Sequence, residues 1–429
     1  MRTLVTFKNN FRAYNKNIQL AFISASFLAV GQGVMMGTVF SVFVKEIGGS
    51  NEALGFISTV GGILSTLTLI PAGILADKIK RQYLLRIGSL TTIIGFFCII
   101  SAQEVGILYL AQGFLGIAQG LNGPALEAII ADSVKSGFRE GVYANLYFVR
   151  TLLNAVGPFI AMILFFILGD NWGIDTLRTV MIFGAIFSII GVLSQMIMSD
   201  TFSLGDESES IIIAVEQKIK NHKNGIKDNS MFVPSMLVAF GILIGLGAGM
   251  TVRFFPIFFK EIYNLPPTSV TFIFGGLAII TAIIGGSTPR LSKIIGKIET
   301  IFLVQILGTM CLFVIAQVPP LSIVVLAFLF RGAFMNASQP ITRSIVMDRV
   351  PKKHRGKWNA LQSVSFGLLW SVSAGIGGVL LDTYNFSTLY YATIVLYILG
   401  TVPVLTLRKY VKNEKIKEKI ILDEPIAIT

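Results

Sequence analysis

Long apolar runs separated by short polar connections occupy almost the whole chain of 429 residues. A run of about 18 or more apolar residues is long enough to cross the hydrocarbon core of a bilayer as a helix. Twelve such runs are present, at 19–44, 53–76, 84–103, 105–131, 143–168, 178–198, 231–259, 268–289, 299–317, 320–346, 358–381 and 387–407. The pattern predicts an all-α polytopic membrane protein with twelve transmembrane helices.

The composition agrees with this prediction and narrows the chemistry. Hydrophobic residues make up 53% of the chain and charged residues only 14%, whereas soluble domains carry about 25% charged residues. Cys98 and Cys311 both fall inside apolar runs and have neither metal-ligand spacing nor the pattern of a disulfide framework. Because a GxxxxGK nucleotide-binding loop is absent from the sequence, ATP is not the expected energy source. We therefore expect no cofactor and no metal site.

The basic residues are distributed unequally between the two predicted sides of the membrane. When successive connections are assigned to alternate sides, 28 of the 35 Lys and Arg fall on one side together with both termini, and three fall on the other. We call these the base-rich and base-poor sides. Since the base-rich side of a membrane protein faces the cytoplasm, we expect a multi-pass protein of the cell membrane with both termini cytoplasmic. The net charge of +12 then reflects topology, and no nucleic-acid partner is expected.

A second copy of the pattern follows the first at a constant offset of 216 residues. Gly31 matches Gly247, and Pro124 matches Pro340. The register continues without a gap from the first predicted helix to the fifth, so the two halves have the same fold and run parallel through the membrane. The predicted organisation is an N-terminal six-helix half at 1–198, a cytoplasmic linker at 199–230, a C-terminal six-helix half at 231–410 and a cytoplasmic tail at 411–429.

Three segments resemble signatures of the major facilitator superfamily. GILADKIKR at 73–81 is similar to its connection between helices 2 and 3, QGFLGIAQGLNGPA at 112–125 to its helix 4, and VPKKHRGKWNAL at 350–361 to its helix 10–11 connection. The resemblance covers nearly the whole chain. It implies a secondary transporter that works by alternating access, with a substrate site near the bilayer midplane between parallel halves. Gln112 stands where proton-coupled exporters of that family carry Arg.

Acidic residues at the predicted base-rich helix ends are candidates for a gate. Asp132 and Asp348 each stand seven residues before an Arg, and Asp77 stands at the end of the second helix. Carboxylates in such places pair with arginines of adjacent turns, and pairs made in only one state favour that state. The alternative is that the bases only set topology. With the support of the family resemblance, the predicted gating residues are Asp77, Arg81, Asp132, Arg139, Asp348 and Arg355.

Ionisable residues inside spans are costly and point to function. Glu127 is the one acid deep in a span and the candidate proton carrier, and Arg343 occupies the equivalent position of the second half. Arg150 completes the predicted proton- or ion-coupling set. The alternatives are that Glu127 and Arg150 neutralise each other, and that Arg343 extends to the membrane surface.

Polar residues on the helices that line the cavity in the resembled family form the predicted substrate site. These are Gln32, Gln119, Arg253, Arg331, Asn336 and Gln339. Hydrogen bonding between helices is the alternative role for such side chains.

Four arginines against one acid inside the spans favour an anionic or polar organic solute, because Arg binds carboxylate and phosphate. A proton-driven exporter of amphipathic compounds and a non-transporting receptor on the same fold are the alternatives. An enzyme is not expected, because nucleophiles and metal ligands do not cluster in the spans. The expected partners are a small-molecule substrate, protons as a candidate coupling ion, and the lipid bilayer around a monomer.

Overall fold

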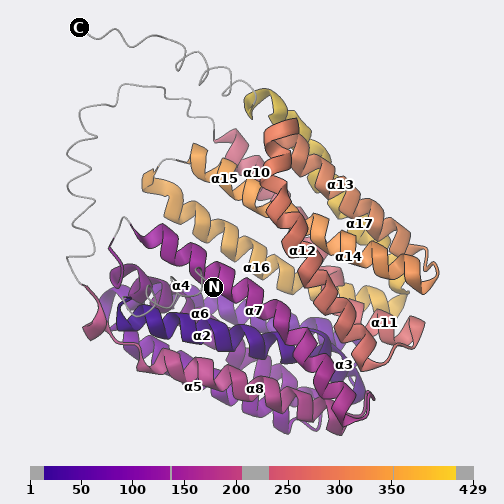
Figure 1. The fold of residues 1–429 in the computed structure, drawn as a ribbon, viewed down its shortest axis with the longest axis horizontal. Helices are drawn as coiled ribbons and strands as arrows, with labels where there is room; N and C mark the ends of the chain where they lie inside the picture. The colour runs from indigo at the N-terminus through magenta and orange to yellow at the C-terminus, as the bar shows by residue number, and fades with distance from the viewer. Residues whose placement is uncertain (1–13, 136–137, 205–230, 351, 412–429) are drawn as a thin grey trace, which may run out of the picture. The chain divides into compact units, whose positions relative to one another are not determined.

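The structure is a computed structural model that describes residues 14–135, 138–204, 231–350 and 352–411. Side chains at 140, 347–348, 352–357 and 359–366 are outside this described part. Every regular element in the described residues is a helix, as Figure 1 shows. The chain forms two compact units, one of Met1–Lys227 with Arg253–Gly275 and the other of Asp228–Val252 with Gly276–Thr429.

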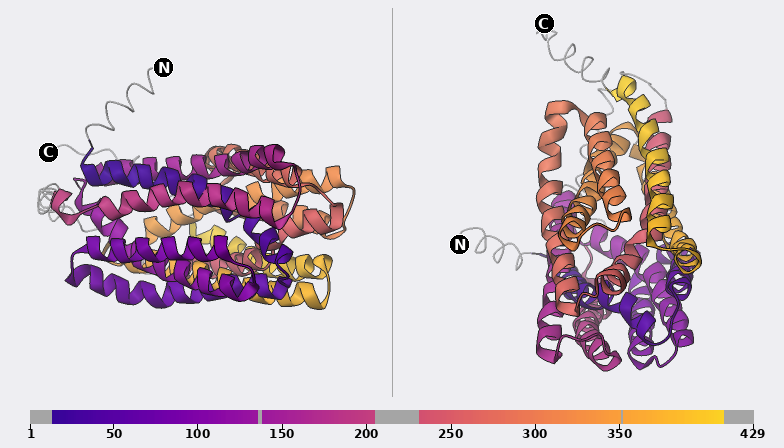
Figure 2. Two further views of the ribbon diagram at one scale, coloured as in Figure 1. Left: turned by 90° about the horizontal axis from the view of Figure 1, so that it is seen from below. Right: turned by 90° about the vertical axis from the view of Figure 1, so that its right-hand side faces the viewer.

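The first unit is a bundle of helices in which five helix pairs make the main contacts. Helix α4 packs against α6, α5 packs against both α6 and α8, and α2 packs against both α7 and α8 (Figures 1 and 2). The bounds are α2 (Lys16–Met35), α3 (Thr38–Glu46), α4 (Asn51–Lys78), α5 (Arg81–Ser101), α6 (Val105–Asp132), α7 (Arg139–Leu168), α8 (Ile174–Ile197) and α11 (Phe255–Tyr263).

The second unit repeats this plan around α10. Helix α10 packs against α16 and α17, and α13 packs against α14 and α17. The bounds are α10 (Phe232–Thr251), α13 (Lys297–Ala316), α14 (Leu321–Ala337), α15 (Gln339–Arg349), α16 (Lys352–Thr383) and α17 (Phe386–Val404), while α12 (Pro267–Ile295) begins in the first unit and ends in the second.

Equivalent glycines of the two sequence copies lie at equivalent helix crossings. A Cβ at Gly31 would lie 2.2 Å from the Ser188 Oγ of α8, and a Cβ at Gly247 would lie 2.6 Å from the Tyr397 ring of α17. Membrane helices approach each other closely where such small residues face a neighbour. The arrangement is consistent with the internal repeat that the sequence predicts.

Three of the predicted spans are broken helices. The first is divided between α2 and α3 at residues 36–37, and the seventh is divided between α10 and α11 by a 3-10 turn, η4 (Val252–Phe254). These two breaks are again 216 residues apart. In the tenth span the helix restarts as α15, with Pro340 in its first turn. A proline there needs no backbone N–H donor, because the first N–H groups of a helix have no acceptor within it.

The number of spans agrees with the sequence prediction. Among the described residues, eleven helices are long and apolar enough to cross a membrane. The remaining span is the 32-residue α16, in which the described residues Gly367–Thr383 are apolar. A helix of that length extends about 48 Å at 1.5 Å per residue, which exceeds the thickness of a bilayer core. The all-α, twelve-helix architecture is therefore confirmed.

Candidate functional site

Two ion pairs join α3 to α11 at the base-poor end of the first unit. The Lys45 Nζ lies 3.6 Å from the Glu261 Oε1, and the Lys260 ammonium forms a close ion pair with the Glu46 carboxylate. Each helix therefore supplies one acid and one base, and the pairs cross. Lys45 and Glu261 are equivalent residues of the two sequence copies, since they are 216 positions apart.

Aromatic packing lies beside these ion pairs. Phe40 and Phe43 of α3 and Phe258 and Phe259 of α11 are each fully buried. The Phe258 and Phe259 rings meet edge to face, with centroids 5.7 Å apart. The two helices that carry the crossed ion pairs therefore also carry fully buried aromatic side chains.

Hydrogen bonds connect two loops at the same end of the first unit. The Asp170 carboxylate accepts hydrogen bonds from the backbone N–H of Thr268 at 2.9 Å and from its Oγ1 at 2.7 Å. A carboxylate at the start of a helix, here α12, satisfies free N–H groups and complements the helix dipole. The Trp172 Nε1 donates to the Leu265 carbonyl at 2.9 Å. The loop after α7 thus holds the loop before α12.

At the base-rich end of the first unit, the structure brings three of the predicted gating residues together. Arg81, which begins α5, forms a close ion pair with Asp132 at the end of α6. The Arg139 Nε donates to the carbonyls of Ala131 at 2.9 Å and Val134 at 3.3 Å. Arg139 therefore stabilises the turn that carries Asp132.

A buried asparagine ties three helices together at this end. Asn17 of α2 is fully buried. Its Nδ2 donates to the Ser133 Oγ and to the Ser199 carbonyl, each at 2.9 Å, and its Oδ1 accepts from the Ser199 N–H at 3.1 Å. The start of α2, the end of α6 and the residues after α8 are fixed by this one side chain.

The other predicted gating residues are not brought into this network. Asp77 is exposed at the end of α4 and forms no ion pair within the described part of the chain. The side chains of Asp348 and Arg355 lie outside the described residues. The predicted pairing of the second copy therefore stays a prediction.

Two arginines predicted to meet substrate have different surroundings. Arg253 lies in η4, at the break of the seventh span, and its Nε is buried with no hydrogen-bond partner among the described residues. Arg331 of α14 is 4% exposed, and its Nη2 donates to the Tyr397 hydroxyl at 2.8 Å and to the Thr251 Oγ1 at 3.3 Å. Arg331 thus links α14 to α17 and α10.

The predicted coupling residues are all exposed. Glu127, Arg150 and Arg343 lie on α6, α7 and α15, respectively. The Tyr143 hydroxyl donates to the Glu127 carbonyl at 3.1 Å. Within the described part of the chain, Glu127 and Arg150 form no ion pair with each other.

Four polar residues of the predicted substrate set are exposed as well. Gln32 lies on α2 and Gln119 on α6. In the second unit, the Gln339 Nε2 donates to the Asn336 Oδ1 at 3.2 Å, and the Asn336 Nδ2 donates to the Gly332 carbonyl at 2.8 Å. Asn336 and Gln339 therefore lie together across the break between α14 and α15.

The sequence analysis did not predict the α3–α11 ion pairs, the hydrogen bonds between Asp170 and Thr268, or the acceptors of Arg331. The offset of 216 residues contained a signal for the first, because it places the basic Lys45 and the acidic Glu261 at equivalent positions. No comparable sequence signal pointed to Asp170 or Tyr397.

Broken apolar helices at equivalent positions of two parallel repeats are the architecture of secondary transporters. The comparisons with known proteins agree with this class. The chain belongs to the Major Facilitator Superfamily, whose family model matches residues 21–330 and 300–425. It is therefore a multi-pass membrane transporter and not an enzyme.

Two solved structures have a similar fold, and a further relative is similar in sequence. The nucleoside transporter NupG is 14% identical, with a TM-score of 0.68 over 92% of this chain and 100% of that one. A D-xylose–proton symporter is 15% identical, with a TM-score of 0.68 over 92% and 97%. A Na(+), Li(+), K(+)/H(+) antiporter of Planococcus maritimus is 21% identical over 195 residues. That match spans less than half of the antiporter, 44% of each chain.

Proposed function

We propose that this protein is a secondary active transporter that moves an anionic or polar organic solute across the cell membrane by alternating access. The observation that carries the anionic preference is Arg253, whose buried Nε lacks a hydrogen-bond partner among the described residues. Arg253 as a whole is half-buried. A buried N–H donor without an acceptor is costly, and a carboxylate or phosphate offers paired acceptors to a guanidinium. The N-terminus of α11 adjoins Arg253 and adds further attraction for an anion.

The proposed orientation places the base-rich end in the cytoplasm, following the rule that relates Lys and Arg to the cytoplasmic side. The α3–α11 contact is then the outer gate. Its two crossed ion pairs stabilise the form that is closed to the outside, and an outward-open form requires both pairs to separate. Because the pairs join equivalent pieces of the first and seventh spans, a rocking motion of the two six-helix halves, 1–198 and 231–410, is the motion that would break them.

We propose that contacts at the base-rich end stabilise the opposite form, which is closed on the cytoplasmic side. The pair of Arg81 with Asp132 holds the turn between α4 and α5 against the end of α6. Asp77 is exposed beside this turn, so it is available to a basic partner in another conformation. We propose that Asp77 makes such a contact when the cytoplasmic side closes.

A second candidate function is proton-coupled exchange of a monovalent cation. It is favoured by the similarity to the Na(+), Li(+), K(+)/H(+) antiporter and by the exposed carboxylate of Glu127 in α6. In that case Glu127 would carry the proton, and its Tyr143 neighbour would hold the α6 backbone in place. Export of amphipathic compounds by the same coupling is the sequence-based variant of this candidate.

Proteoliposomes loaded with a panel of labelled carboxylates, organophosphates, Na⁺ and K⁺ test these candidates, with and without a pH gradient. The variants are Arg253→Gln and Glu127→Gln, and Arg290→Gln is the matched control because Arg290 is exposed at the end of α12. Anion flux that is lost in Arg253→Gln and retained in Arg290→Gln supports the first candidate.

The same flux measurements can also contradict the first candidate function. Anion flux that survives Arg253→Gln removes this residue from the substrate site. Cation flux that requires a pH gradient and Glu127, but not Arg253, supports the second candidate instead. Saturable binding of a solute in the absence of any flux would support a receptor on this fold.

A further inference from the structure

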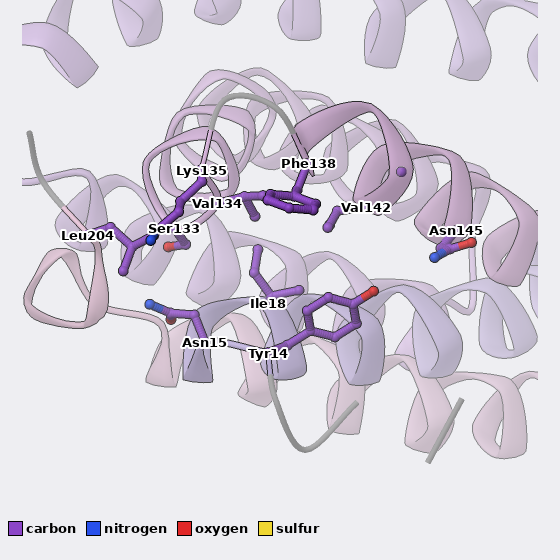
Figure 3. A pocket seen from close by; sticks show the side chains of 11 residues that line it. Tyr14, Asn15, Ile18, Ser133, Val134, Lys135, Phe138, Val142, Asn145 and Leu204 are labelled. Carbon is purple, nitrogen blue, oxygen red and sulfur yellow. The ribbon is translucent and has the colours of Figure 1, made fainter. Parts of the chain in front are cut away.

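A cavity of about 760 Å³ opens at the base-rich end of the first unit, apart from the residues assigned to transport. Its walls come from the start of α2, residues 133–135 directly after α6, and Phe138 with the first turns of α7 (Figure 3). Lys135 and Asn15 lie at one end of the cavity and Asn145 at the other, with the Phe138 ring facing Ile18 between them. Its volume falls within the range of small-molecule sites.

The cavity lies at the level where three membrane helices end. Helix α2 begins at Lys16, α6 ends at Asp132 and α7 begins at Arg139, and residues of the cavity directly precede or follow these bounds. The ends of spanning helices lie at the headgroup level of a bilayer. A ligand from the membrane surface therefore reaches this cavity without crossing the hydrocarbon core.

The polar groups of the cavity suit a phosphate. The Lys135 ammonium, the Tyr14 hydroxyl and the Asn145 amide can all donate hydrogen bonds, and within the described part of the chain none of them bonds to another side chain. The lining residues include no Asp or Glu. An anion at the Lys135 end of the cavity therefore meets an ammonium and no repelling carboxylate, while the Tyr14 hydroxyl and the Asn145 amide are donors toward the other end.

The apolar groups of the cavity suit the rest of a lipid. Ile18 and Val142 are buried in its wall, and Phe138 is 67% exposed at its mouth. A free inorganic anion gains nothing from these side chains, whereas the glycerol backbone and first methylenes of a phospholipid bury apolar surface against them. Basic pockets between membrane helices on the cytoplasmic side are typical sites for anionic headgroups.

We propose that this cavity binds the headgroup of an anionic phospholipid from the leaflet at the base-rich end. Lys135 pairs with the phosphate at one end of the cavity, and the Tyr14 hydroxyl and Asn145 amide, toward the other end, donate to oxygens of the glycerol part of the lipid. The bound lipid bridges α2 to residues 133–135, which directly follow Asp132 of the Arg81–Asp132 pair.

The test uses the purified full-length protein in mixed micelles with phosphatidylglycerol or phosphatidylcholine, and native mass spectrometry counts the retained lipids. Lys135→Gln removes the charge. Gly141→Phe adds bulk at the cavity lining, where a Cβ at Gly141 meets nothing within 4 Å. Lys78→Gln is the matched control, since Lys78 is an exposed base at the same end and outside the cavity.

We expect the preference of the wild type for phosphatidylglycerol to fall about fivefold in Lys135→Gln, the effect typical of one base at a membrane surface. Gly141→Phe is expected to lose the retained lipid, and Lys78→Gln to keep it. Equal retention in all four proteins overturns the proposal, as does equal retention of both lipids by the wild type. Release by millimolar inorganic phosphate would assign the site to a soluble anion. If lipid is retained only after residues 205–230 are deleted, the cavity is instead a site for the chain's own linker, and the proposal is overturned.

Discussion

Reversal of one charge at the α3–α11 contact gives a quantitative prediction. Lys45→Glu removes the pair with Glu261 and places two carboxylates opposite each other. The two side chains are 22% and 40% exposed, so solvent screening limits the lost pair to about 1 kcal/mol. Repulsion between the like charges adds about the same amount, and a total of about 2 kcal/mol corresponds to about a thirtyfold shift toward the open form.

Labelling of a single cysteine from the outside measures this shift. Gln32→Cys is a suitable reporter because Gln32 is exposed on α2, and α3 separates it from the base-poor end. Cys98 and Cys311 are first replaced by Ala. While the closed form dominates, the rate of reaction with a membrane-impermeant maleimide in right-side-out vesicles is proportional to the open population.

We expect Lys45→Glu to raise this rate by at least tenfold. The control is the charge swap Lys45→Glu with Glu261→Lys, which restores the attraction and should return the rate to within twofold of the wild type. If the single reversal changes the rate by less than twofold, or the swap fails to restore it, the ion pair does not hold the closed form.

Three further predictions address the same features. Salt at about 1 M outside shortens the Debye length to about 3 Å and should speed labelling of the Gln32→Cys reporter. The labelling rate should not rise in a control in which all four charged residues are replaced by Gln, namely Lys45, Glu46, Lys260 and Glu261. If salt speeds labelling equally in both proteins, screening of these ion pairs is not the cause. Tyr397→Phe removes a buried acceptor of Arg331 and should lower the free energy of unfolding by about 1–3 kcal/mol in thermal melts, whereas Tyr384→Phe, 64% exposed, should not. Asp170→Ala removes two hydrogen bonds at the start of α12 and should destabilise the protein by about 1 kcal/mol. Asp77→Ala is its control, because Asp77 is exposed at the end of α4. Equal melting of both variants would contradict a capping role.

The spans and the repeat could be predicted from sequence because both depend on local patterns. Each apolar run needs only its own length to indicate a helix, and Gly31 with Gly247 needs only a constant offset. The breaks at residues 36–37 and 252–254 were not predicted. Both interrupt runs that stay apolar on each side, so the hydrophobic pattern does not reveal where the backbone turns.

The site was less predictable because its residues meet through tertiary packing. In the sequence, Lys45 is only one of three bases on the base-poor side. Its ion pair with Glu261 depends on how α3 packs against α11. Arg331 was predicted from its type and its span, but its acceptors Tyr397 and Thr251 come from two other helices. The roles predicted for Glu127 and Arg253 stay predictions.

The most direct test of transport by alternating access is to lock the α3–α11 contact during flux. Lys45→Cys with Glu261→Cys, treated with a short bifunctional methanethiosulfonate reagent, joins the two helices through disulfides that a reductant reverses. In proteoliposomes loaded with the panel solute that the wild type carries, we predict that crosslinking stops exchange and that reduction restores it, while each single variant is unaffected. Unchanged exchange in the crosslinked protein would contradict the central claim, because solute would then cross without this contact opening.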